Sequence, residues 1–573
     1  MIKMIKRLPL GRTAAAIAFL FVQIVCSLYL PYLTADIVNK GVVAGNTTFI
    51  WTQGFLMILL SVCGLVGAVL NTLFFSKISY KLGMELREEL FDKVLKFSRH
   101  EFDKIGTSSL ITRNTNDVTQ VQTLVEMILK FLILSPAYLI GGIIMTWQMS
   151  PSLAMIFVWA IPFLAAAYFV IYRFASPLYA RMQKLLDKLN LYFREALTGV
   201  KVIRAFGKEE QDFERYSEVN QAYAKTSVKA GTIMSLFVPG ISFLLGLVTV
   251  LITWTGSQGI AAGTIDVGSL IGAVSYSAQI LMGFAMLTAV IMAVPRGQIS
   301  AKRIGEVLDM PLSIEDPQKA GEAGAEEFTL TFEDVDFRYF GAEKKTLSGI
   351  NFTVRKGQTL AVIGSTGEGK SSLAQLVLRL YDVEEGHVKI NGTDVRSLPQ
   401  EGLHKMVSFS PQASTLFMGT IRFNMLVGKP DATDDEIWAA LDMAQASEFV
   451  RRLPDGLDSP VEKGGGNFSG GQKQRLCIAR TLLKKAEIYI FDDSFSALDF
   501  KTDAMVRAAM KKKLDNAITV IVAQRISTVM DADLIAVLDK GTLAGLGTHE
   551  ELSRNNPVYR EILDSQVYKE VAV

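Results

Sequence analysis

Five long stretches of the chain contain no charged residue, and each is long enough to cross a lipid bilayer. They cover residues 13–35, 41–76, 131–172, 230–265 and 267–295. About 20 helical residues span the hydrocarbon core at 1.5 Å per residue, so the third stretch can hold two helices with Pro151 in the turn between them. The pattern therefore predicts six membrane-spanning helices, at about residues 13–35, 52–76, 128–148, 152–174, 232–255 and 268–294.

The amino-acid composition also indicates that part of the chain lies in a lipid bilayer. Half of the 573 residues are hydrophobic, 20% are charged and the mean hydropathy is +0.29. Buried helices of a soluble core are the alternative, but so many charge-free runs of this length are not expected there. The net charge of +2 is too nearly neutral for a polybasic nucleic-acid binder, so we expect no nucleic acid among the partners.

The lysines and arginines between the charge-free stretches predict the orientation of the chain. Residues 77–130 carry nine basic residues and residues 173–229 carry eleven, whereas the alternate connections carry only Lys40. Basic connections stay on the cytoplasmic side, so both termini and these two segments should be cytoplasmic and the protein should lie in the cell (plasma) membrane. Both segments are rich in helix formers and should extend the membrane helices into the cytoplasm.

Residues 301–573 differ from residues 1–300 in the sign of their net charge. Lys and Arg exceed Asp and Glu by nine over residues 1–300, but fall seven short of them over residues 301–573. A polar, acidic stretch containing Gly and Pro, residues 313–327, reads as a linker. We therefore expect an all-α six-helix transmembrane domain at residues 1–312 and an α/β domain at residues 328–573.

A phosphate-binding loop marks the α/β domain. The apolar strand TLAVIG is followed by GSTGEGKS, the pattern G-x-x-x-x-G-K-[ST], and then by an apolar-periodic helix. Glycines let the loop point its backbone N–H groups at phosphate oxygens, and the helix dipole adds to this attraction. Lys370 would reach the β- and γ-phosphates and Ser371 would hold Mg²⁺. The expected nucleotide-binding residues are Gly364, Ser365, Thr366, Gly367, Glu368, Gly369, Lys370, Ser371 and Ser372.

Two further segments fit a nucleotide site. The strand IYIFDD delivers Asp492 at its carboxyl end, where a magnesium-binding carboxylate belongs, although such a strand is more often simply part of a core. The segment NFSGGQKQR opens a helix with Ser-Gly-Gly, which exposes N–H donors and a hydroxyl to an anion. An ordinary capped loop is the alternative reading of that segment.

The set and order of these motifs resemble an ABC (ATP-binding cassette) exporter half-transporter, with six spans fused to one cassette. The resemblance implies that Tyr339 stacks on adenine, that Gln412 in the Gln loop senses Mg²⁺, and that Asp499 in the SALD loop lies at a dimer interface. It also implies a signature motif that contacts the γ-phosphate of ATP held by a partner cassette, formed by Ser469, Gly470, Gly471 and Gln472. Mg²⁺ would be held by Ser371, Gln412 and Asp492.

The membrane half takes part in this resemblance. Residues 190–216 are similar to the second cytoplasmic extension of the exporter family. By the same resemblance, short elements flanking residues 101–116 and 206–216 would be coupling helices that touch the cassettes.

The sequence departs from the family at two catalytic positions. The family pattern places Glu after the strand Asp and His at the end of the next strand, whereas this chain has Asp493 and Gln524. Asp is one methylene shorter than Glu, so it would polarise the attacking water from a displaced position. Gln cannot carry the positive charge of an imidazolium. This pattern predicts a site that binds ATP with Mg²⁺ but hydrolyses it slowly, while the signature motif completes a competent site on a partner. Drift within a still active site is the alternative.

We expect one subunit of a heterodimeric exporter that moves hydrophobic or amphipathic compounds out of the cell, as in multidrug efflux. Its partners would be a second half-transporter, the bilayer and the transported molecule. The alternatives are a homodimeric lipid or peptide exporter, and an ATP-gated, non-hydrolytic channel or regulator. In the membrane half, Glu126 and Lys130 have the spacing of an i,i+4 ion pair, with a substrate role as the alternative.

Overall fold

The computed structural model describes residues 8–317 and 328–571. The chain divides into two compact units: one of residues 1–94 and 108–310, the other of residues 95–107 and 311–573. One boundary between the units lies near residue 311, and residues 95–107 belong to the second unit. Of the predicted linker, residues 318–327 lie outside the described residues.

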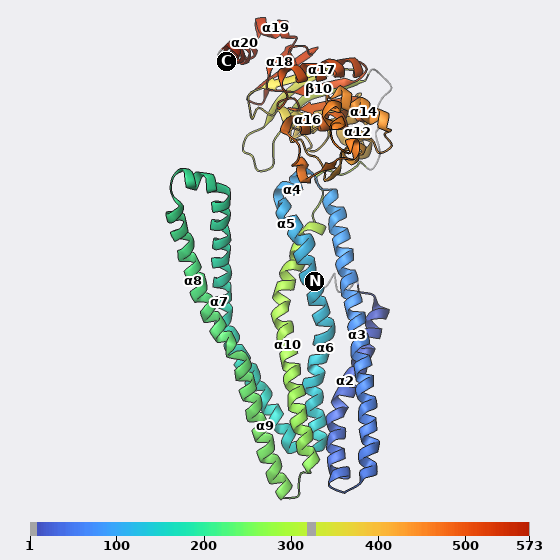
Figure 1. The fold of residues 1–573 in the computed structure, drawn as a ribbon, viewed down its shortest axis with the longest axis vertical. Coiled ribbons are helices and arrows are strands. Elements are labelled where there is room, and N and C mark those ends of the chain that lie inside the picture. Colours follow the sequence, from blue (N-terminus) through green and yellow to red (C-terminus); the bar gives the residue numbers. More distant parts are fainter. Residues whose placement is uncertain (1–7, 318–327, 572–573) are drawn as a thin grey trace. The chain divides into compact units, whose positions relative to one another are not determined.

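The first unit consists of long helices (Figure 1). In chain order they are α2 Leu10–Asp36 with its π-helical end η1 Ile37–Val42, α3 Thr47–Leu95, α5 Thr107–Thr112 with η2 Arg113–Asp117, α6 Val118–Met149, α7 Pro151–Ala205, α8 Glu209–Ser235, α9 Phe237–Ala261 and α10 Val267–Leu308.

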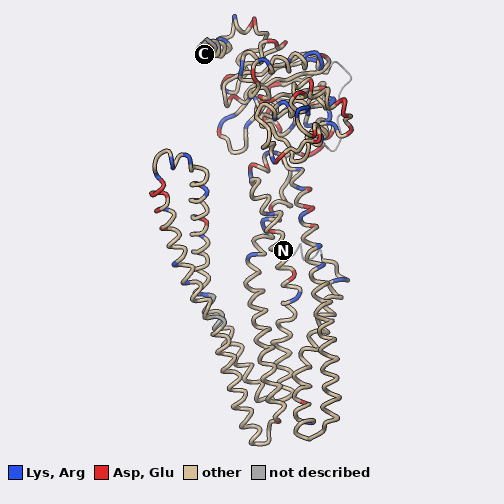
Figure 2. Tube along the Cα trace, in the orientation of Figure 1, with Lys and Arg blue, Asp and Glu red and all other residues tan. Residues whose placement is uncertain are grey.

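Five helical segments within the described residues are long and apolar enough to cross a membrane. They are Leu10–Val42, Thr47–Leu95, Thr107–Met149, Glu209–Ala261 and Val267–Leu308. The remaining predicted span, about residues 152–174, lies on α7, where Pro151–Ala166 is a shorter apolar stretch. The count of six spans therefore stays a prediction. Figure 2 shows few charged positions along the middle of these helices, and both signs of charge at the turn between α7 and α8.

Small residues and interhelical hydrogen bonds hold α10 against its neighbours. The Tyr276 hydroxyl donates to the carbonyl of Leu28 on α2 at 2.6 Å, and Ser135 on α6 donates to the carbonyl of Gly283 at 2.7 Å. A Cβ on Gly268 would lie only 2.1 Å from the carbonyl oxygen of Ala35, so the backbones of α10 and α2 touch there. Close approach at small residues is how helices pack in a lipid environment, where apolar burial gives little driving force.

The second unit is built around a six-stranded sheet in the order β12-β11-β3-β10-β9-β6. Five strands are parallel and β12 is antiparallel: β3 Thr359–Gly364, β6 Val407–Ser410, β9 Ile488–Asp492, β10 Ile518–Val522, β11 Leu534–Asp539 and β12 Thr542–Gly547. A four-stranded antiparallel sheet, ordered β2-β1-β4-β5, contains β1 Thr329–Phe337, β2 Leu347–Arg355, β4 Glu385–Ile390 and β5 Thr393–Asp394. A short pair joins β7 Gly419–Thr420 to β8 Pro460–Val461.

Helices surround these sheets. They are α4 Arg99–Ile105, α11 Lys370–Val377, α12 Gln400–Met406, α13 Ile421–Leu426, α14 Asp434–Met443, α15 Ser447–Arg451, α16 Gly470–Leu483, α17 Phe500–Lys513, α18 Ile526–Val529, α19 His549–Asn555 and α20 Pro557–Val571.

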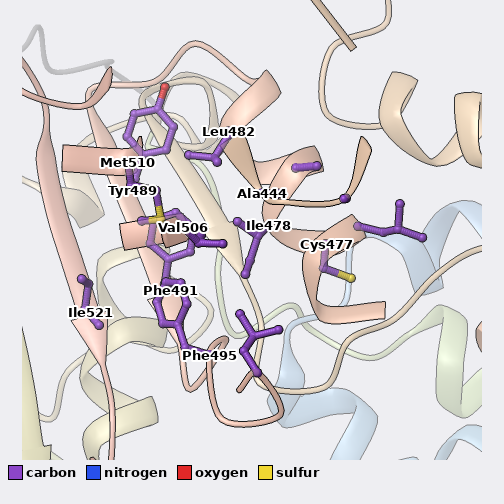
Figure 3. Packing of buried hydrophobic residues seen from close by; sticks show 14 of the residues in the cluster. Ala444, Cys477, Ile478, Leu482, Tyr489, Phe491, Phe495, Val506, Met510 and Ile521 are labelled. Atoms are coloured by element: carbon purple, nitrogen blue, oxygen red, sulfur yellow. The ribbon is translucent and has the colours of Figure 1, made fainter. Parts of the chain in front are cut away.

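The central strands are buried on both faces because their side chains alternate between two cores. On β9, Tyr489 and Phe491 point into one core with α16 and α17, and Ile488 and Ile490 into the other with α11 and the four-stranded sheet. Figure 3 shows Phe491 packed beside Phe495, Val506 and other members of the first core. The strand therefore delivers its last residue, Asp492, from a rigid position.

The short helix α4 packs against other residues of the second unit. Ser98 and Glu101 form a capping box at its start, and the buried Glu101 carboxylate accepts the backbone N–H of Ser313 at 2.9 Å. Burial alone would raise the pKa of Glu101, but the hydrogen bonds from Ser98 and Ser313 leave that pKa below its usual range. His100 packs edge-on against Phe340, with 4.5 Å between ring centroids. A coupling role stays a prediction for α4, and so does contact of residues 206–216, the α7–α8 turn, with a cassette.

Candidate nucleotide-binding site

The loop between β3 and α11 is shaped by glycines. Gly367 and Gly369 adopt φ values of 96° and 88°, a left-handed region in which a side chain would be strained. A Cβ on Gly369 would also approach the carbonyl oxygen of Thr346 to 2.9 Å. The loop then enters α11 at Lys370, so the free N–H groups of the helix start lie at the loop.

Lys370 lies buried across the loop that precedes it. Its Nζ donates to the carbonyl oxygens of Gly364 at 2.8 Å and Ser365 at 2.6 Å. Burial lowers the pKa of the ammonium group, and the nearby carboxylates of Asp493, Glu368 and Asp492 oppose that shift. The two loop carbonyls thus hold the ammonium group of Lys370 at the loop. A phosphate oxygen could take their place as its hydrogen-bond acceptor.

Ser371 and Asp492 meet from two different elements. The Ser371 hydroxyl donates to the Asp492 carboxylate at 2.8 Å, and Asp492 is 2% exposed at the end of β9. Burial raises the pKa of Asp492, and the hydrogen bond from Ser371 partly offsets that rise. A hydroxyl, a carboxylate and the amide oxygen of Gln412, which lines the same cavity, are hard oxygen ligands of the kind that Mg²⁺ prefers. The donor set therefore fits the metal.

Asp493 and Gln524 lie side by side at the ends of neighbouring strands. The Gln524 side-chain amide is 3.5 Å from an Asp493 carboxylate oxygen, and the Asp493 backbone N–H donates to the carbonyl of Val522 at 2.9 Å. Asp493 has a φ of 47°, which is uncommon for a residue other than glycine. Burial raises the pKa of its carboxyl group, although Ser496 and Gln412 are hydrogen-bonded to it.

These residues line one cavity of about 280 Å³. Its walls contain eleven of the predicted residues: Tyr339, Thr366, Gly367, Gly369, Lys370, Ser371, Ser372, Gln412, Asp492, Asp493 and Gln524. Gly364, Ser365 and Glu368 are not in the lining, and Glu368 instead accepts the backbone N–H of Gly541 at 3.1 Å.

Three lining residues were not anticipated from the sequence: Thr346, Val522 and Ala523. Val522 and Ala523 directly precede Gln524, so their position in the chain was an available signal. Thr346 carries no such signal, because only the fold brings the end of the β1–β2 connection against the phosphate-binding loop.

Tyr339 lies at the wall of the cavity, as its predicted role requires. Its hydroxyl is 2.7 Å from the Ser372 hydroxyl, and its ring packs edge-on against Tyr381 at 5.2 Å between centroids. The hydrogen bond ties the ring to the helix that follows the phosphate-binding loop. Stacking on adenine remains a prediction for this residue.

The signature segment lies apart from the lining of this cavity. Ser469 caps α16 and forms a capping box with Gln472, in which Ser469 N–H donates to the Gln472 side chain at 2.9 Å. Ser469 and Gly470 are exposed, and a Cβ on Gly471 would lie 3.1 Å from the carbonyl oxygen of Ala497. Asp499 caps α17 with its carboxylate, which accepts the backbone N–H of Thr502 at 2.9 Å, and is exposed. The start of α16 is therefore exposed and lies outside the lining of the chain's own cavity.

In the membrane unit, Glu126 and Lys130 do not pair with each other, contrary to the expected i,i+4 ion pair. Glu126 accepts from the Ser76 hydroxyl at 2.8 Å, and Lys130 donates to the Thr72 hydroxyl at 3.0 Å. Both partners lie on α3. These two ionisable residues therefore join α6 to α3.

A phosphate-binding-loop domain fused to a set of long apolar helices defines an ATP-driven membrane transporter. Comparison with known proteins gives the family. Residues 13–284 match the model of the ABC transporter transmembrane region, and residues 347–496 match the ABC transporter model. The chain belongs to the ABC transporter family, as an exporter half-transporter whose membrane and ATP-binding domains share one polypeptide. It is accordingly a multi-pass membrane protein.

Relatives support this assignment along the whole chain. An uncharacterized ABC transporter ATP-binding protein of Mycobacterium tuberculosis is 39% identical over 572 residues, which are 97% of this chain and 96% of that protein. A protein of Bacillus subtilis named as a probable multidrug resistance ABC transporter ATP-binding/permease protein is 32% identical, over 84% of this chain and 82% of its own. The solved structure of a bacterial Atm1-family ABC exporter with ATP bound is 26% identical, with a TM-score of 0.81 and coverage of 97% and 98%.

Proposed function

We propose that the chain is one subunit of a heterodimeric exporter whose own nucleotide site binds MgATP but hydrolyses it slowly. The observation that carries the proposal is the combination of an intact binding set with two altered catalytic positions. Lys370, Ser371 and Asp492 converge on the cavity, while Asp493 and Gln524 occupy the places where the family pattern has Glu and His.

In this proposal, some residues of the site bind MgATP and others act in its hydrolysis. Lys370 and the loop N–H groups hold the phosphates, and Ser371 and Asp492, with Gln412, hold Mg²⁺, which when bound neutralises negative charge on the phosphate oxygens. Asp493 faces the place of the attacking water, but its carboxylate is one methylene short of the family position. A misplacement of about 1 Å can cost roughly a hundredfold in rate. Gln524 donates a hydrogen bond but brings no positive charge.

The signature segment gives the chain its second role. Ser469 and Gly470 are exposed and lie outside the chain's own cavity, so the helix start that they form is available to ATP bound by another cassette. Two cassettes facing each other would each supply a signature to the other's site. The altered positions Asp493 and Gln524 would then slow hydrolysis at this chain's own site, while its intact signature would complete the site of the partner.

The proposed substrate is a hydrophobic or amphipathic compound moved out of the cell, as in multidrug efflux. Support comes from the apolar helices of the membrane unit and from the printed name of the Bacillus subtilis relative. We further propose a plasma-membrane location with both termini and the cassette in the cytoplasm, based on the basic residues of segments 77–130 and 173–229.

Purification of the tagged full-length chain from its native membranes tests the proposal. The expected result is a second half-transporter in equal amount, with Glu and His at the positions of Asp493 and Gln524. A complex of two copies of this chain with brisk ATP hydrolysis would contradict it. Accumulation of a dye in inverted vesicles against its gradient separates a pump from the alternative, an ATP-gated channel, which only dissipates gradients.

A further inference from the structure

The C-terminal helix α20 is anchored on the cassette by its first half. Tyr559 is fully buried, and Ile562 and Leu563 pack against the core that also contains Phe491. Asn556, just before the helix, donates to the carbonyl of Ala544 at 2.9 Å. These contacts fix the position and direction of the first half of α20.

Gln566, two helical turns beyond Tyr559, bridges the backbone of a segment that lines the nucleotide cavity. Its side-chain amide nitrogen donates to the carbonyl oxygen of Gln524 at 2.8 Å. Its amide oxygen accepts the backbone N–H of Ile526 at 2.7 Å. A glutamine side chain has one donor end and one acceptor end, so it can satisfy both backbone groups at once.

Neither of the two bridged groups, the Gln524 carbonyl and the Ile526 N–H, belongs to a regular hydrogen-bonded strand pair or to the hydrogen bonds inside a helix. Ile526 is the first residue of the four-residue helix α18, so its N–H has no partner inside that helix. On the other side, the Arg525 guanidinium donates to the carbonyl of Ser496 at 3.0 Å. The segment is thus held between the loop that follows β9 and the C-terminal helix.

We propose that Gln566 is a positioning residue for the nucleotide site: by holding the carbonyl of Gln524 and the N–H of Ile526, it fixes the backbone that aims the Gln524 side chain at the terminal phosphate. Gln524 lines the cavity together with Lys370 and Asp493, so its direction depends on this backbone. The inference goes beyond the slow-hydrolysis proposal, because it concerns the aim of Gln524 whichever rate the site has.

A positioning role of Gln566 should affect the affinity for ATP relative to the affinity for ADP. A side chain aimed at the terminal phosphate contributes to the binding of ATP and not to that of ADP. Loss of the bridge should therefore weaken ATP binding selectively. A purely structural role of Gln566 in holding α20 on the core would change both affinities together, or neither.

The test uses the full-length chain, purified with whatever subunit accompanies it, and three variants. Gln566→Leu removes both hydrogen bonds. Gln566→Glu keeps an acceptor for Ile526 but cannot donate to Gln524. Asp564→Asn changes an exposed residue of the same helix and is the matched control. For each, hydrogen–deuterium exchange reports the amide of Ile526, and equilibrium binding reports the affinities for ATPγS and ADP with Mg²⁺.

In Gln566→Leu, the Ile526 amide should exchange at least about tenfold faster, and ATPγS affinity should fall about three- to tenfold while ADP affinity stays unchanged. Gln566→Glu should keep the amide protected and still lose ATPγS affinity. Unchanged exchange in Gln566→Leu, an equal fall in both affinities, or wild-type ATPγS affinity in Gln566→Glu would each overturn the inference. If Gln566→Leu does not fold, the Gln566→Glu result alone decides.

Discussion

The side-chain amide of Gln524 lies 3.5 Å from the carboxylate of Asp493, where two neighbouring parallel strands end. In the family pattern the same two places hold His and Glu, and the substitution of both shortens the base and removes a positive charge. Binding groups and hydrolytic groups are distinct in this site. The ground-state interactions of Lys370 and Ser371 would therefore persist even where hydrolysis is slow, as we propose for this site.

Lys370→Ala should strongly weaken nucleotide binding by this chain. Lys370 is the buried ammonium group at the loop, and a hydrogen bond to a charged partner contributes about 1.5–3 kcal/mol, or roughly 10- to 100-fold in affinity. Photolabelling by a radioactive ATP analogue should mark the wild-type chain and lose most of its intensity in the variant. Lys405→Ala, a largely exposed lysine outside the cavity lining, is the control. Absence of labelling in the wild type would show that the cassette is inert.

Asp492→Asn should remove the dependence of nucleotide binding on Mg²⁺. The Asp492 carboxylate is the only acidic group hydrogen-bonded to Ser371 among the residues described, and a neutral amide is a poor ligand for this metal. Titrations with and without Mg²⁺ should differ for the wild type and coincide for the variant. Asp455→Asn, outside the cavity lining, should keep the wild-type difference. An undiminished effect of Mg²⁺ in Asp492→Asn would place the metal elsewhere.

Single cysteines should report the proposed topology in a chain whose own three cysteines are replaced. Cysteines placed at residues 43–46 or 262–264, in the turns before α3 and before α10, should react with a membrane-impermeant maleimide added to intact cells. A cysteine at position 210, near the α7–α8 turn, should react only after the cells are opened. Labelling of position 210 from outside would reverse the proposed orientation.

Gly268→Val should loosen the contact between α10 and α2. A Cβ at this position would lie 2.1 Å from the carbonyl oxygen of Ala35, so the helices must separate, and overpacking of this kind costs about 1–3 kcal/mol. The variant should melt at a lower temperature in detergent. Gly246→Ala, where a Cβ would meet nothing within 4 Å, should not be destabilised. Equal melting temperatures for Gly268→Val and the wild type would show that the contact is not formed.

Local sequence pattern was sufficient to predict the parts of the site that lie on single elements. The apolar strands, the glycines of the loop and the helix that follows them predicted where Lys370, Ser371 and Asp492 stand on their own elements. The strand order of the fold then brings the carboxyl ends of β3, β10 and β9 to one edge. The charge-free runs likewise located the five helical segments that are long and apolar enough to cross a membrane, since lipid excludes charge.

Contacts between distant elements could not be predicted in this way. The expected Glu126–Lys130 pair was wrong because hydroxyl groups on α3, 50 and 58 residues away in the chain, provide competing partners. The bridge from Gln566 to Gln524 spans 42 residues and depends on how α20 lies on the core. Neither partner's sequence neighbourhood contains a pattern for such a contact.

The asymmetry between this chain's own site and its signature motif is the central claim, and steady-state ATPase activity of the purified complex tests it. Asp493→Ala should lower turnover less than about twofold, because on our proposal the site already lacks a well-placed base. Ser469→Arg and Gly471→Glu should lower turnover roughly a hundredfold, because the proposed competent site on a partner would lose donors that stabilise the transferring group. If Asp493→Ala stops hydrolysis while both signature variants remain active, the chain carries its own working site and the account is wrong.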